Sequence, residues 1–128
     1  MTPLIWVTAI LAGLVHVLIF CMESLLWTTP AVYVRFRQSL ERAEATKLLA
    51  FNQGFYNLFL AVGTFAGLAA VMTGHPRVGW TLVYWNCAFM LGAALVLAVS
   101  APQLRRGAVI QGAAPLLFLA LAAIRWAI

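Results

Sequence analysis

Charged side chains are scarce in this sequence, and acidic ones are the scarcest. Of 128 residues only three are Asp or Glu and eight are Lys or Arg, whereas 65% are hydrophobic and the mean hydropathy is +0.99. Soluble globular domains carry about 25% charged residues. The composition therefore excludes a soluble globular domain and indicates a polytopic membrane protein.

Cysteine is also rare, and the chain has two, Cys21 and Cys87. They fall at different positions along their predicted spans, which separates them by about 13 Å in membrane depth at 1.5 Å rise per helical residue. A disulfide needs its two Cα atoms within about 7 Å. We therefore expect no disulfide between them.

Long apolar runs dominate what is present. A bilayer core about 30 Å thick requires about 20 apolar residues per helical span, so this length accommodates four spans in one domain. Turn and helix-ending signals separate the runs at Pro30, Gly74-His75-Pro76 and Pro102. We predict an all-α, four-helix membrane bundle over residues 1–128, with spans at about residues 3–27, 48–73, 79–101 and 108–127.

The basic residues gather in two of the connections and therefore predict the orientation. Arg77 and Arg125 lie on one side, and the connections after the first and third spans hold the others: Arg35, Arg37, Arg42, Lys47, Arg105 and Arg106. Because Lys and Arg are retained on the cytoplasmic side, both termini should lie on the non-cytoplasmic side of the plasma (inner) membrane. This placement also argues against a nucleic-acid partner, since these charges set topology.

The connection over residues 32–47 is the one extended polar segment, and two interpretations stay open for it. One is a short helix on the lipid headgroups that runs into the second span. The other is a solvated hairpin connection.

The second span begins with the stretch Asn52-Gln53-Gly54-Phe55-Tyr56-Asn57. Amides at membrane depth are costly unless they find partners or enclose a ligand. On a helix Gln53 and Asn57 lie within about 40° of each other, so we expect them to contact a ligand or Glu23. Asn52 and Tyr56 turn toward a glycine-lined flank, where they are predicted to hold helices or subunits together and are also candidate ligand contacts.

The first span carries its polar groups on one stripe, because Glu23 and Trp27 lie within about 20° of His16 around a regular helix. An unpaired carboxylate at the bilayer centre costs about 2.5 to 3.5 kcal/mol on insertion scales, so Glu23 needs donors, a proton or water. We predict Glu23 as a general acid or ligand anchor, His16 as its proton partner and Trp27 as a ligand contact. A structural carboxylate pair and a core histidine are the alternatives.

The third and fourth spans add Asn86 and Gln111 as candidate ligand contacts. Amides also join helices by hydrogen bonds worth about 0.6 kcal/mol each, which is the alternative for both. With Glu23, Gln53 and Asn57 they describe a polar pocket open toward the cytoplasm or the inner leaflet.

His16 and Glu23 lie about 10 Å apart along one helix, so these two side chains cannot chelate one ion and no metal site is expected. No cofactor is expected either, and haem ligated by His16 is the alternative.

These features favour an enzyme or binding protein for a small lipophilic molecule, with acid–base isomerisation or epoxide opening as the fitting chemistry. The rival hypothesis is a non-catalytic transporter subunit or an assembly factor. Gly63 and Gly67 form a Gly-x-x-x-Gly pair that permits close approach of another helix. That pair leaves a homo-oligomer, a dimer or a trimer, open.

Two stretches carry a resemblance to a known family. Met-Glu-Ser-Leu-Leu-Trp at residues 22–27 and Phe-Asn-Gln-Gly-Phe-Tyr-Asn-Leu-Phe-Leu-Ala at 51–61 resemble a family of small bacterial and fungal four-span proteins catalogued as a domain of unknown function. The resemblance covers essentially the whole chain and implies the four-span fold without an activity. The signature positions that it implies are Glu23, Trp27, Asn52, Gln53, Tyr56 and Asn57.

The chain is more weakly similar to the membrane-associated eicosanoid and glutathione metabolism proteins, which also have four spans. Glu41-Arg42 and residues 52–57 look loosely similar to the start of their second helix. The position that carries a second-helix glutamate in those proteins is not acidic here, so glutathione is not an expected ligand. This similarity implies a homotrimer with sites between subunits.

Overall fold

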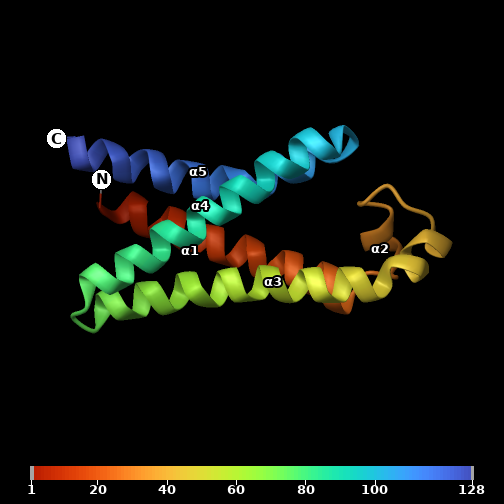
Figure 1. The fold of residues 1–128 in the computed structure, drawn as a ribbon, viewed down its shortest axis with the longest axis horizontal. Helices are drawn as coiled ribbons and strands as arrows, with labels where there is room; N and C mark the ends of the chain where they lie inside the picture. Colours follow the sequence, from red (N-terminus) through yellow and green to blue (C-terminus); the bar gives the residue numbers. More distant parts are fainter. Residues whose placement is uncertain (1, 128) are drawn as a thin grey trace.

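The structure, a computed structural model, describes residues 2–127, which fold as helices joined by short connections (Figure 1). The elements in chain order are α1 (Thr2–Phe20), η1 (Cys21–Leu25), α2 (Pro30–Tyr33), α3 (Leu40–Met72), α4 (Pro76–Ser100), η2 (Pro102–Leu104) and α5 (Arg105–Ala127). No strand occurs among the described residues.

Four helical segments are long and apolar enough to cross a membrane. They are Thr2–Leu25, Leu40–Met72, Pro76–Ser100 and Pro102–Arg125. The predicted all-α, four-helix membrane bundle is confirmed, and the protein is a multi-pass membrane protein.

The second long helix begins at Leu40, earlier than the span predicted from about residue 48. Ser39 is its N-cap, and the Ser39 hydroxyl accepts a 3.2 Å hydrogen bond from the Arg42 backbone N–H. Residues 40–47 of the polar connection therefore form the first turns of α3, and the four-residue α2 precedes them. With 33 residues α3 is about 50 Å long, so it reaches well beyond a bilayer core about 30 Å thick.

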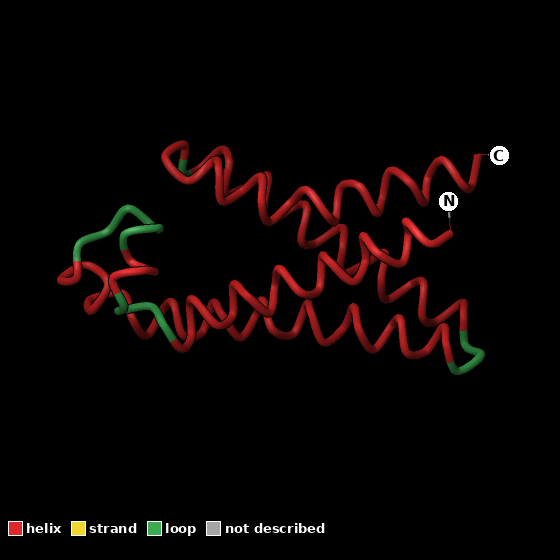
Figure 2. Tube along the Cα trace, turned by 180° about the vertical axis from the view of Figure 1, so that it is seen from behind, coloured by secondary structure: helices red, strands yellow, loops and turns green. Residues whose placement is uncertain are grey.

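The two ends of the bundle differ in how closely the helices pack. α1 and α3 run side by side, while α4 crosses them and leads into α5, and both termini lie at the end that holds the α3–α4 turn (Figure 1). The α1–α3 and α4–α5 connections lie at the other end, where the view from behind shows them apart (Figure 2). We call this the connection end of the bundle.

Close packing of α3 on α4 depends on glycine. A Cβ at Gly67 would lie 2.8 Å from the Gly79 carbonyl oxygen, and one at Gly79 would lie 2.7 Å from the Val71 nitrogen. Gly63 similarly faces the Asn86 side chain. The predicted close approach at the Gly-x-x-x-Gly pair is confirmed, and the approaching helix is α4 of the same chain.

This crossing predicts opposite effects for two Gly→Ala substitutions in α4. Gly79→Ala should destabilise the protein by about 1 to 3 kcal/mol, because the added methyl group meets backbone atoms that cannot move aside. Gly92→Ala is the matched control, because nothing lies within 4 Å of a Cβ there, and it should be neutral or stabilising. Unfolding in dodecyl sulfate followed by circular dichroism measures both, and equal effects would contradict the role of the crossing.

Candidate functional site

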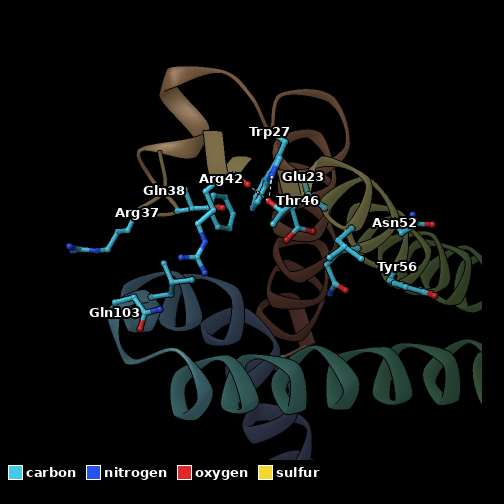
Figure 3. Close-up of a pocket in the computed structure, with 14 residues that line it drawn as sticks. Glu23, Trp27, Arg37, Gln38, Arg42, Thr46, Asn52, Tyr56 and Gln103 are labelled. Carbon is cyan, nitrogen blue, oxygen red and sulfur yellow. Dashed lines mark hydrogen bonds between the residues drawn. The ribbon is translucent and has the colours of Figure 1, made fainter. Parts of the chain in front are cut away.

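A cleft of about 690 Å³ opens at the connection end of the bundle. Its volume lies in the range of about 300 to 1,000 Å³ that is typical of small-molecule pockets. Its walls come from η1, the segment before α3, the first half of α3 and the α4–α5 connection (Figure 3). The lining residues are Glu23, Trp27, Phe36, Arg37, Gln38, Arg42, Thr46, Leu49, Ala50, Asn52, Gln53, Tyr56, Gln103 and Leu104.

Glu23 lies in a π-helical turn. In η1 the Leu26 backbone N–H donates a 3.0 Å hydrogen bond to the Cys21 carbonyl, five residues back. Such wide turns inside α-helices are frequent at functional sites. One extra residue in a turn rotates the side chains beyond it by about 100°, so the regular-helix stripe from His16 to Trp27 does not continue through η1.

Asn57 is the hydrogen-bond partner of the Glu23 carboxyl group. Its Nδ2 donates to Glu23 Oε2 at 2.9 Å and to the carbonyl of Gln53 at 3.2 Å. Asn57 is buried and Glu23 is half-buried. The expected contact between Asn57 and Glu23 is therefore present, and it joins η1, in the first long apolar segment, to α3, the second.

Gly54 allows α3 to lie directly against η1. A Cβ at Gly54 would overlap Ser24 Oγ and would lie 3.0 Å from the Ser24 nitrogen. Ser24 Oγ in turn donates a 2.8 Å hydrogen bond to the Phe51 carbonyl. The glycine of the Asn-Gln-Gly stretch thus sets the separation at which Asn57 reaches Glu23.

The Trp27 side chain connects the segment that precedes α3 to α3. Its Nε1–H donates a 3.2 Å hydrogen bond to Thr46 Oγ1. Its ring lies 4.8 Å from that of Phe36, measured between centroids. Together these contacts form an aromatic wall of the cleft.

The other predicted α3 residues line the cleft as exposed side chains. Gln53, Asn52 and Tyr56 all belong to the lining, and Tyr56 is 65% exposed. Asn52 donates to the Leu48 carbonyl of its own helix at 2.8 Å. In Figure 3, Asn52 and Tyr56 point away from the Arg42 side. Within the described chain Asn52 and Tyr56 form no hydrogen bond to another helix, so a role in holding helices together stays a prediction.

Four predicted site residues lie outside the cleft lining: Asn57, which is buried against Glu23, and His16, Asn86 and Gln111. His16 is fully buried, with Nδ1 2.9 Å from the Ala12 carbonyl oxygen and Nε2 without a partner among the described residues. Asn86 is half-buried against Gly63 and bonds its own helix at Leu82. Gln111 is half-buried in α5. His16 lies two turns before Glu23 along the helix, and Asn86 packs against Gly63, farther along α3 than the cleft residues.

No group of three His, Cys or Glu side chains suited to hold a metal ion occurs within residues 2–127. The cleft offers one carboxyl group, that of Glu23, together with amides, a phenol and two guanidinium groups. Its chemistry is therefore that of hydrogen bonding, proton exchange and anion binding.

Seven residues of the cleft lining come from the connections predicted between spans and were not among the predicted site residues. They are Phe36, Arg37, Gln38, Arg42, Thr46, Gln103 and Leu104. The basic residues among them were assigned to topology, and the polar composition of both connections was the one available signal for the others.

The chain belongs to the family described as "Protein of unknown function (DUF1304)", whose model matches residues 10–123. Every residue of the cleft lining falls inside this match. No curated protein and no solved structure matches the chain. The resemblance to a family of unknown function is confirmed, and the weaker resemblance to eicosanoid and glutathione proteins stays a prediction.

The contact between Gly54 and Ser24 can be tested by a double-mutant cycle. Gly54→Ala should destabilise the protein by about 1 to 3 kcal/mol because the methyl group meets the Ser24 hydroxyl. Ser24→Ala removes that hydroxyl, so the double variant should lose less stability than the sum of the single variants, by about 0.5 kcal/mol or more. Additive effects in dodecyl sulfate unfolding would show that the two residues do not meet.

Proposed function

We propose that the protein binds a small lipophilic molecule in the cleft and exchanges a proton with it through Glu23. The observation that carries the proposal is the carboxyl group of Glu23, half-buried within a segment long and apolar enough to cross a membrane, in a cleft of about 690 Å³, and held by the amide of Asn57. Within the described residues the Glu23 carboxyl group forms no ion pair. It can therefore gain or lose a proton without breaking an ion pair.

The lining suits a ligand that is mostly apolar with few polar groups. Trp27, Phe36 and Leu49 offer aromatic and aliphatic surface, while Glu23 and Gln53 offer hydrogen bonds. Pockets of this kind bind through apolar contact and are made specific by a small number of polar groups. The arrangement supports binding from the membrane rather than from water.

Isomerisation is the reaction that one carboxyl group can complete alone. As a carboxylate, Glu23 takes a proton from a carbon next to a carbonyl group of the ligand and then returns it to a second carbon, so that a double bond moves and no other reactant is consumed. Asn57 acts here as a positioning residue. His16 does not line the cleft, so the proposal assigns the proton to Glu23 without it.

The hypothesis of a transporter subunit has less support than that of an enzyme or binding protein. A second cavity, of about 460 Å³, is lined by Ile5, Trp80, Tyr84 and Arg125 and shares no lining residue with the cleft. Fully buried side chains fill the core of the bundle, among them Phe118 and Met90. A transporter needs access from both sides of the membrane, whereas a binding or catalytic protein needs a pocket with access from one side only.

The proposal places the cleft at the cytoplasmic face of the plasma membrane. The connections that flank it hold six of the eight basic residues, and the opposite end holds Arg77 and Arg125. The positive-inside rule supports this orientation.

Filling the cleft should remove the bound molecule. Leu49→Trp places a large side chain in the lining, whereas Leu48→Trp does so outside it on a residue of nearly equal exposure, 74% against 72%. Protein purified from its own host should retain a lipophilic molecule that mass spectrometry identifies. Leu49→Trp should retain severalfold less of it and Leu48→Trp the wild-type amount, and equal retention by the two variants would contradict binding in the cleft.

Proton exchange should depend on Glu23. In D2O, the wild type should introduce deuterium into the retained molecule at a carbon that does not exchange unaided. Glu23→Gln should lower that rate about 100-fold or more, the usual contribution of a general acid–base group. Glu44→Gln is the control, since Glu44 is exposed and outside the lining. Exchange by Glu23→Gln at the wild-type rate would refute the role.

A further inference from the structure

Two arginines give the outer part of the cleft a strong positive charge. Arg42 extends from the first turn of α3 toward Gln103 in the α4–α5 connection, and Arg37 points outward at the rim (Figure 3). Gln38 lies between them in the lining. Arg42 of one connection thus faces Gln103 of the other across the mouth.

The guanidinium groups of Arg37 and Arg42 are not used by the fold of the described chain. Neither forms an ion pair with Glu41 or Glu44, and neither donates a side-chain hydrogen bond within residues 2–127. Arg105 differs, since its Nε donates to the Ala98 carbonyl at 3.2 Å. The donors of Arg37 and Arg42 are therefore free for a ligand at the mouth of the cleft.

Arg37 also has a backbone conformation that a glycine would adopt more easily. Its φ is 54°, the one positive φ among the described non-glycine residues. Its N–H donates to the Val34 carbonyl and the Gln38 N–H to the Tyr33 carbonyl, both at 3.0 Å, which is the helix-ending motif that usually places glycine at this position. A side chain retained at such a position, on the rim of a cleft, points to a function for it.

We propose that the ligand of the cleft is an anionic amphiphile, with a phosphate or carboxylate group that Arg42 binds and Arg37 attracts at the rim. Arginine binds both groups through paired, charge-assisted hydrogen bonds. The apolar part of the ligand then lies along Trp27 and Leu49 toward Glu23. This inference rests on the proposed function and names its ligand class; a membrane phospholipid and a free single-chain amphiphile both supply the chemistry.

The test uses the full chain in nanodiscs of phosphatidylcholine, which has no net charge. Three probes are titrated: the phosphate monoester of a long-chain dibrominated alcohol, the free alcohol, and a dibrominated phosphatidylglycerol. Bromine quenches tryptophan fluorescence on contact. Trp27 lines the cleft, so the difference between wild type and Trp27→Phe isolates the signal from the cleft.

The phosphate monoester should half-saturate the wild type at a concentration about tenfold or more below that of the alcohol, the usual gain from a charge-assisted contact. Arg42→Gln should abolish this preference. Arg37→Gly should reduce it without lowering thermal stability, because glycine adopts a positive φ freely. The matched control is Arg35→Gln, on an exposed arginine of the same connection outside the lining, and it should keep the preference.

Phosphatidylglycerol that binds as tightly as the monoester identifies a membrane lipid as the source, and tighter binding of the monoester identifies a free amphiphile; both results support the inference. Equal binding of monoester and alcohol would overturn it and leave the proposed function standing. Loss of the preference in Arg35→Gln as complete as in Arg42→Gln would overturn it as well, because surface charge alone would then suffice. No quenching above the Trp27→Phe background by any probe would overturn the proposed function together with the inference.

Discussion

The close approach of η1 to Gly54 determines the geometry of the whole cleft. Because Gly54 has no side chain, Ser24 can reach the Phe51 carbonyl, and the wide turn that carries Ser24 is held against α3. That contact brings Asn57 to 2.9 Å from Glu23. The carboxyl group, the amides of α3 and the aromatic wall at Trp27 all depend on this one separation between two backbones.

One end of the bundle is closely packed and the other holds the cleft. At one end glycines in α3 and α4 allow the backbones to touch, and apolar side chains such as Val83 and Met90 are completely buried. At the connection end α1 and α3 stay together while α4 and α5 diverge from them (Figure 1). The divergence leaves amides and guanidinium groups facing a cleft, an arrangement that a uniformly packed bundle could not accommodate. Close packing at the first end therefore holds together a bundle that is open at the second.

Much of the fold could be predicted from the sequence because the bilayer constrains it strongly. Hydropathy and the Gly-His-Pro turn near Gly74 were enough to define four helices, and regular helical spacing was enough to bring Asn57 toward Glu23. The same spacing failed beyond Cys21, since a π-helical turn has no signature in a single sequence and it changes which side chains share a face. Arg37 and Arg42 were interpreted as topology signals because their approach to the cleft depends on how the two connections meet in space.

The basic part of the cleft, at Arg42, is separated from its acidic part, at Glu23. This separation limits the shape of any ligand that contacts both. Arg42 and Asn57 are 15 residues apart in α3 (57 − 42), which is about 22 Å along the helix axis. The Arg42 side chain spans only part of this length toward the carboxyl group at Asn57. An elongated molecule with an anionic end and an apolar body therefore matches this separation better than a compact anion. The aromatic and aliphatic surface between these two polar regions is the feature of the cleft that the proposed amphiphile would contact.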